Sequence, residues 1–171
     1  MIQTERLLIQ KPDKEDFLRF YEINSDPKTN IYNPNGEMDY ETAEIVFKEI
    51  LIHWRINDFG VWKISERNTP NYTIGFGGLT YKNYEGIIKL NLGFRFDKLF
   101  FGKGYATEFG RKAIGYGFEV LKKSEIFGLV RPKNINSINV LKKCNLKLHE
   151  KLNDVPNEED SLVYRIEKTD G

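Results

Sequence analysis

The sequence predicts an α/β (α+β) fold of about seven strands and about four helices, in a single domain over residues 1–171. Two apolar stripes recur at helical spacing, one over residues 43–54 and one over residues 106–121. Three short strand-like runs lie between them: residues 59–65, 72–81 and 87–96. The turns that join these runs are short, which favours an antiparallel meander.

The other elements follow in the order β-α-α-β-β-β-α-β-α-β-β. Residues 6–11 read as the first strand, and Asp13 with Asp16 forms an imperfect capping box that starts the first helix. A second helix begins near Asp39 and stops at Asn57-Asp58, and the third begins after Gly104. The C-terminal part reads as a strand, a short helix and two closing strands: residues 126–130, 137–143, 146–152 and 161–166.

The charge balance gives no reason to expect nucleic acid or an anionic membrane as a partner. The chain has 26 Lys and Arg against 25 Asp and Glu, a formal net charge of +1. No apolar run approaches the roughly 18 residues that cross a bilayer, and the N-terminus does not resemble a signal peptide. A single cysteine, Cys144, fits a reducing compartment. We therefore expect a soluble cytoplasmic protein, either a monomer or a homodimer.

Residues 101–107 form a glycine-rich turn between a strand and the longest helix. Glycines at 102 and 104 permit positive φ angles and close approach of a ligand to the backbone. A helix N-terminus presents unpaired N–H groups to an anion, so this turn suits a phosphate group, with Lys103 adding a charge. The spacing does not match a P-loop, and Thr107 stands where a dinucleotide motif requires its third glycine. The alternative is that the glycines only make a tight turn.

Four segments in the same order resemble the GCN5-related N-acetyltransferase (GNAT) superfamily, and within it the RimJ/RimL-like ribosomal-protein-alanine acetyltransferases. They read T-E-R-L-L-I at residues 4–9, L-G-F at 92–94, G-K-G-Y-A-T-E at 102–108 and N-I-N-S-I-N-V-L at 134–141. The resemblance implies a splayed mixed sheet, in which acetyl-CoA enters between the strands at 87–96 and 126–130. The cofactor residues that it implies are Leu92, Gly93, Phe94, Arg95, Phe96, Phe101, Gly102, Lys103, Gly104, Tyr105, Ala106, Thr107, Asn134 and Ser137.

The catalytic groups are less clearly marked. Asn91 stands where many relatives place a glutamate, and Leu141 stands where many place a tyrosine acid. Asn91 cannot accept a proton, although it could hold a water. Ser137 is the acid that the resemblance implies for the departing thiolate, with capping of the short helix as the alternative. Direct attack by an amine mainly requires orientation, and a backbone N–H from residues 92–96 could stabilise the developing oxyanion.

A site with a weak base suits an amine of low pKa. An α-amine has a pKa of about 7.7–8.0, against about 10.4 for lysine. Two hypotheses concern the acceptor: a protein N-terminus, or a small amine such as an aminoglycoside, a polyamine or an amino-acid analogue. A coenzyme A-binding protein without turnover is the third hypothesis.

The remaining polar residues admit plainer interpretations. Asp154, Glu158, Glu159 and Asp160 form either a solvated hairpin tip or a rim that attracts a cationic amine. His53 and His149 have no partners at metal-ligand spacing, so both are interpreted as structural and no metal is expected. Cys144 has no neighbouring base and is also interpreted as structural.

Overall fold

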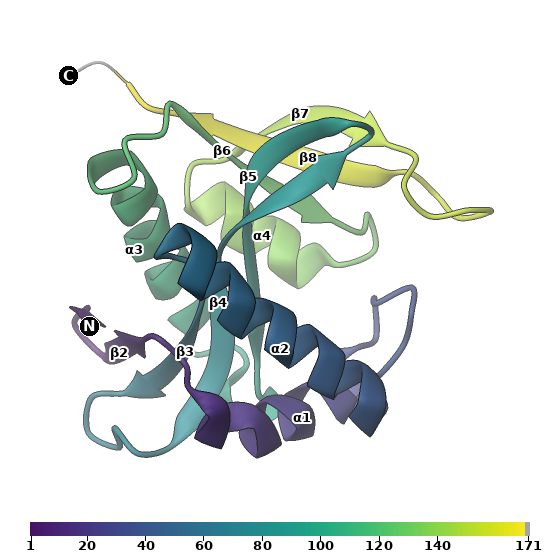
Figure 1. Cartoon of the computed structure of the whole chain (residues 1–171). Helices are drawn as coiled ribbons and strands as arrows, with labels where there is room; N and C mark the ends of the chain where they lie inside the picture. The colour runs from purple at the N-terminus through teal and green to yellow at the C-terminus, as the bar shows by residue number, and fades with distance from the viewer. Residues whose placement is uncertain (170–171) are drawn as a thin grey trace. The chain divides into compact units, whose positions relative to one another are not determined.

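The computed structural model describes residues 1–169, which contain four α-helices and eight strands (Figure 1). The helices are α1 (Phe17–Ser25), α2 (Tyr40–Asn57), α3 (Tyr105–Glu119) and α4 (Ile135–Lys143). The strands are β1 (Ile2–Gln3), β2 (Leu7–Gln10), β3 (Val61–Glu66), β4 (Thr73–Tyr84), β5 (Ile87–Phe96), β6 (Glu125–Val130), β7 (Lys147–Leu152) and β8 (Ser161–Glu167). Three short 3-10 helices are η1 (Lys14–Asp16), η2 (Pro27–Thr29) and η3 (Lys98–Phe100).

The strands are hydrogen-bonded in the order β1-β2-β3-β4-β5-β6-β8-β7, which confirms the expected α/β fold with a mixed sheet. β5 and β6 run parallel, and their register within the described residues joins one pair, Asn91 with Phe127. β6 and β8, by contrast, pair along six residues. The sparse pairing of β5 with β6 agrees with the splayed sheet that the family resemblance implied.

The chain divides into two compact units. The first contains residues 1–78 and 94–105, and the second contains residues 79–93 and the described residues from 106 onward. Both β4 and β5 contribute residues to each unit. The single domain expected over residues 1–171 therefore stays a prediction.

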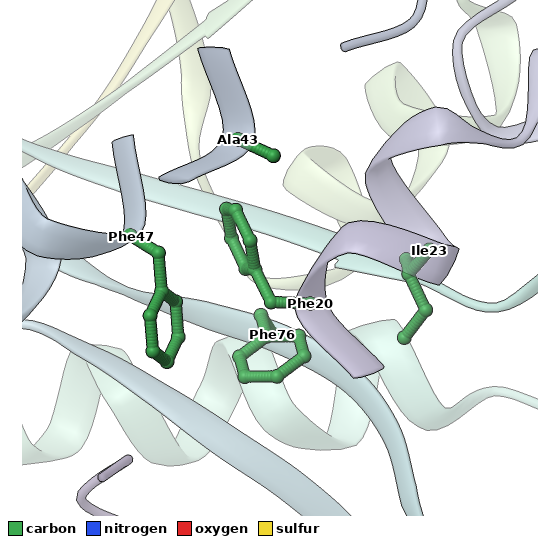
Figure 2. Packing of buried hydrophobic residues seen from close by; sticks show 5 residues of the cluster. All are labelled: Phe20, Ile23, Ala43, Phe47 and Phe76. Atoms are coloured by element: carbon green, nitrogen blue, oxygen red, sulfur yellow. The ribbon is translucent and has the colours of Figure 1, made fainter. Parts of the chain in front are cut away.

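The core of the first unit joins α1 and α2, which lie side by side, to β4 (Figure 2). The ring of Phe20 lies 5.1 Å from that of Phe47 and 5.3 Å from that of Phe76. Burial of each phenylalanine side chain stabilises the folded state by about 1.5–3 kcal/mol relative to leaving it exposed. The bounds of α2 follow the sequence, since Asp39 accepts a hydrogen bond from the Thr42 N–H at 2.8 Å and Asp58 ends the helix with a φ of 58°.

In the second unit, α3 lies very close to its neighbours because small residues face them. A methyl group added at Gly110 would lie 2.8 Å from Sγ of Cys144, and one at Gly117 would lie 2.6 Å from Cδ1 of Ile126. Such distances require displacement of the neighbour. The packing therefore depends on glycine at both positions.

Among the differences from the sequence prediction, two boundaries and one additional strand are the clearest. The turn expected at residues 82–86 is shorter, because β4 continues to Tyr84, which is 2% exposed. α4 begins two residues before the predicted start. β1 was not predicted, since two residues carry no periodic signal. Among the described residues, none of the helices has the length and apolar character required to span a membrane.

Candidate active site

The predicted cofactor residues are divided between the two units. Phe94–Phe96 and Phe101–Tyr105 belong to the first unit. The second contains the other six: Leu92, Gly93, Ala106, Thr107, Asn134 and Ser137. The chain itself joins the two groups, within β5 and at the start of α3.

The glycine turn has the backbone that a phosphate site requires. Gly102 has a φ of 74° and Gly104 a φ of 81°, and both are exposed. Nothing lies within 4 Å of the position that a side chain at Gly102 would take. α3 begins at Tyr105, so its unpaired N–H groups directly follow the turn. This exposed, positively polarised backbone fits a pyrophosphate group.

Arg6 braces this turn, a role that the sequence analysis missed. Its Nη1 donates to the carbonyl oxygen of Lys103 at 2.9 Å, and its guanidinium lies 4.5 Å from the centroid of the Tyr105 ring. The Tyr105 hydroxyl in turn donates to Glu66 on β3. Arg6 belongs to the T-E-R-L segment, so the motif that opens the chain supports the turn 97 residues later. Only the recurrence of that motif in relatives could have indicated the contact.

The side chains of β5 alternate between two faces. Leu92 is buried and would lie 3.8 Å from a methyl group at Gly110 of α3. Phe96 is also buried, beside Gly75 of β4. Asn91, Gly93 and Arg95 occupy the alternate positions and are half-buried. The strand therefore presents polar groups on one face only.

Asn91 has an unexpected partner in Tyr84. The Tyr84 hydroxyl donates to Oδ1 of Asn91 at 2.6 Å. Burial raises the pKa of Tyr84, and the charges of Asp154 and Glu150 raise it further. Tyr84 thus keeps its proton at neutral pH, and its hydroxyl occupies one acceptor position of the Asn91 amide oxygen. The pair contains no general base.

The start of α4 corrects one sequence hypothesis. Asn134 is the N-cap, because its Oδ1 accepts a hydrogen bond from the Ser137 N–H at 3.1 Å. Ser137 is therefore the third residue of the helix, and the interpretation of Ser137 as its cap is wrong. Asn134 retains its amide N–H groups for a ligand. Capping of α4 is therefore no longer an alternative to the proposal that Ser137 donates a proton.

Two residues near the end of α4 are part of the core. Leu141 is 2% exposed and packs against Gly128 of β6. Cys144 is buried, its thiol lies 3.6 Å from the carbonyl oxygen of Thr107, and burial raises its pKa to about 11. A neutral, buried thiol is a poor nucleophile, which agrees with the structural role expected for Cys144.

The negative charge of the acidic loop between β7 and β8 is partly balanced by an arginine that follows β6. Arg131 donates to the Ser161 hydroxyl at 2.9 Å and lies 3.9 Å from a carboxylate oxygen of Asp154 and 3.8 Å from one of Glu158. The positive charge reduces the attraction that these carboxylates exert on a cationic amine. Among the described residues, no group of three or more His, Cys, Asp and Glu side chains is placed to hold a metal ion.

Comparison with known proteins places this geometry in context. The family model described as acetyltransferase (GNAT) domain matches residues 6–147. An uncharacterized N-acetyltransferase of Bacillus subtilis, YnaD, is 26% identical over 153 residues, covering 85% of this chain and 82% of its own. The crystal structure of a GNAT-family acetyltransferase from Bacillus anthracis is 25% identical, with a TM-score of 0.80 and 97% of both chains covered. Spermidine N-acetyltransferase from Vibrio cholerae, solved with CoA and spermine, has the same fold at 16% identity, a TM-score of 0.76 and 96% of both chains covered.

Proposed function

We propose that this chain, which belongs to the acetyltransferase (GNAT) domain family, is an N-acetyltransferase that transfers the acetyl group of acetyl-CoA to a primary amine by direct attack. Transfer to an amine is the activity of the family, and acetyl-CoA is the donor that its members use. The observation that carries the proposal is the glycine turn at residues 101–104. Two exposed glycines with positive φ lead straight into the N-terminus of α3.

The turn is proposed to bind the pyrophosphate of acetyl-CoA. Three sources of positive potential meet there: the N–H groups at the start of α3, Lys103 and Arg6. The Lys103 ammonium lies 4.8 Å from the centroid of the Phe100 ring, on the same short segment. A site made of backbone N–H groups makes few demands on side chains. A phenylalanine at position 101 is therefore compatible with this role.

Transfer of the acetyl group from the thioester to an amine has two main requirements. The two reactants must be positioned, and the leaving thiolate must receive a proton. Backbone N–H groups of residues 92–96 are proposed to polarise the carbonyl oxygen. Ser137 is proposed to pass a proton to the thiolate as the C–S bond breaks, and to regain one from the nitrogen, which attacks as a neutral amine and loses a proton as the amide forms. Tyr84 and Asn91 offer no base. An acceptor with a low pKa, such as an α-amine, therefore suits this site best.

Two acceptor classes follow, a protein N-terminus and a small-molecule amine. The RimJ/RimL-like motifs favour a protein N-terminus. The preference for an amine of low pKa is compatible with both classes. Release of thiol from acetyl-CoA in the presence of a peptide panel and an amine panel separates them. A protein that binds acetyl-CoA but releases no thiol with any acceptor would be the non-catalytic alternative.

The donor site is tested by replacing Gly104 with valine and measuring acetyl-CoA affinity by calorimetry. Valine would strain a backbone with a φ of 81° and block the approach of the ligand, so binding should be lost. Gly86→Val is the matched control, because Gly86 also has a positive φ, 91°, with nothing within 4 Å. Unchanged affinity in a folded Gly104→Val protein would refute the placement.

A further inference from the structure

Arg95 carries a half-buried positive charge, and within residues 1–169 its single partner is Asn30. It lies near the end of β5, within the first unit, and its Nη1 donates to Oδ1 of Asn30. Desolvation lowers the pKa of Arg95, and no nearby carboxylate opposes this shift. An arginine nevertheless remains charged in a protein. The guanidinium is thus partly desolvated, and no carboxylate of residues 1–169 lies within 4 Å of it.

Asn30 is held in one orientation, and it fixes Arg95. Its Nδ2 donates to the carbonyl oxygens of Asn24 at 2.8 Å and Asp26 at 2.9 Å. These two acceptors settle which end of the amide is oxygen, so Oδ1 faces Arg95. Asn33 donates to the same oxygen at 3.0 Å. The guanidinium is therefore held on one side by a neutral, preorganised group that does not cancel its charge.

The carboxylates of this region are paired with other cations. Asp97 pairs with Arg19 at 2.5 Å, and Asp26 pairs with Lys98 at 2.7 Å. Over residues 1–169, every other lysine or arginine that is not exposed has a carboxylate within 4 Å or an aromatic ring beside it. Arg95 has neither.

We propose that Arg95 is the receptor for a carboxylate on the acceptor, so that the substrate is an amine that also carries a carboxylate. The guanidinium is only partly exposed and has no carboxylate partner within residues 1–169, so a ligand carboxylate can both reach it and pair with it. One N–H of the guanidinium is used by Asn30, which leaves donors for a bidentate bond with a carboxylate. This inference rests on the proposed acetyl transfer and narrows its substrate class.

The substrate class agrees with the rest of the chain. An amino acid or a short peptide combines a carboxylate with an α-amine of low pKa, the amine that a site without a base favours. In the acidic loop, the attraction that Asp154 and Glu158 would exert on a polycationic acceptor is reduced by Arg131. The structure therefore favours amino-acid-like acceptors over polyamines.

The first experiment compares each acid with its amide. Glycylglycine with glycylglycinamide, and β-alanine with β-alaninamide, are assayed as acceptors by thiol release from acetyl-CoA. In the Arg95→Gln protein, the ratio of kcat/KM for acid over amide should fall about 10- to 100-fold. Comparing this ratio between the variant and the wild-type protein cancels the difference in amine pKa between acid and amide. Arg95→Lys keeps the positive charge but loses the paired N–H donors of the guanidinium, so the acid-to-amide ratio should fall less. This variant replaces Arg95→Gln in the experiment if Arg95→Gln does not fold.

The matched control is Arg55→Gln, which removes the same charge from an exposed position in the last turn of α2. It should leave the acid-to-amide ratio unchanged. An unchanged ratio in both Arg95 variants would overturn the proposal. So would a loss of acetyl-CoA affinity with the ratio preserved, because the guanidinium would then serve the donor.

The second experiment requires no turnover. Binding of N-acetyl-glycylglycine and of its amide is measured by calorimetry in the presence of CoA. The wild-type protein should prefer the acid, and Arg95→Gln should lose that preference. If no amine is acetylated but this preference is found, the proposed function fails and the carboxylate site stands. Equal binding of acid and amide by the wild-type protein overturns the site.

Discussion

Replacing Leu141 with tyrosine should destabilise the protein and leave its turnover no faster. Many relatives of the GNAT superfamily place a tyrosine acid at this position, so the substitution restores their residue. In this chain, however, Leu141 is 2% exposed and its side chain faces the Gly128 backbone. A methyl group at Gly128 would already lie 2.8 Å from Cδ2 of Leu141 and 3.2 Å from Cδ1. No space for a ring is present there.

The expected magnitude follows from two costs. Overpacking a filled core costs about 1–3 kcal/mol, and a buried hydroxyl without a partner costs about 1–3 kcal/mol more. The sum is about 2–6 kcal/mol. For a domain of this size, each kcal/mol lowers Tm by about 2–4 °C. The Tm of Leu141→Tyr should therefore fall by at least about 4 °C.

Thermal unfolding followed by circular dichroism gives the stability, and thiol release from acetyl-CoA gives kcat. Leu141→Met is the control, because a swap that conserves volume should cost less than about 1.5 kcal/mol. A Leu141→Tyr protein as stable as wild type, with a higher kcat, would show that position 141 reaches the reacting atoms. The packing argument would then be wrong.

Two further predictions concern the movement of protons. Ser137→Ala should lower kcat while acetyl-CoA affinity and Tm stay near wild type, because Asn134 and not Ser137 caps α4; a loss of Tm with kcat intact would instead assign Ser137 a structural role. For an α-amine acceptor, kcat/KM should rise with pH and level off near the pKa of the acceptor, about 8, since Tyr84 and Asn91 supply no base. Acceptors of lower pKa should move that bend to lower pH, and a bend common to all acceptors would point to an enzymic carboxylate, with Asp154, Glu158, Glu159 and Asp160 the first to replace.

The helices could be predicted because their signals are local. Asp13 and Asp16 form the capping box that the sequence suggested, and Asp39 caps α2 as expected. Helical capping and periodicity depend on residues three or four positions apart, so a short window contains the information. The apolar stripe over residues 106–121 likewise predicted α3, which spans Tyr105–Glu119.

The strand arrangement was only partly predictable. The meander of β3, β4 and β5 followed from short turns, whereas the position of β8 between β6 and β7 did not. Strand neighbours are chosen by pairing between distant segments, which leaves no trace in a local pattern. The extension of β4 to Tyr84 was missed for the same reason, because its last residues are polar and Tyr84 is buried by contacts that include Phe127.

The candidate site shows the same division. The sequence by itself determined the glycine turn, since only glycine readily takes the φ angles found at 102 and 104. Only the tertiary structure brought Arg6 to Lys103, Tyr84 to Asn91 and Asn30 to Arg95. Backbone conformation is a property of the residue itself, whereas the charge balance of a buried arginine depends on which distant carboxylates the fold assigns to other cations. Asp97 and Asp26 pair with Arg19 and Lys98, and among residues 1–169 no carboxylate lies within 4 Å of the Arg95 guanidinium.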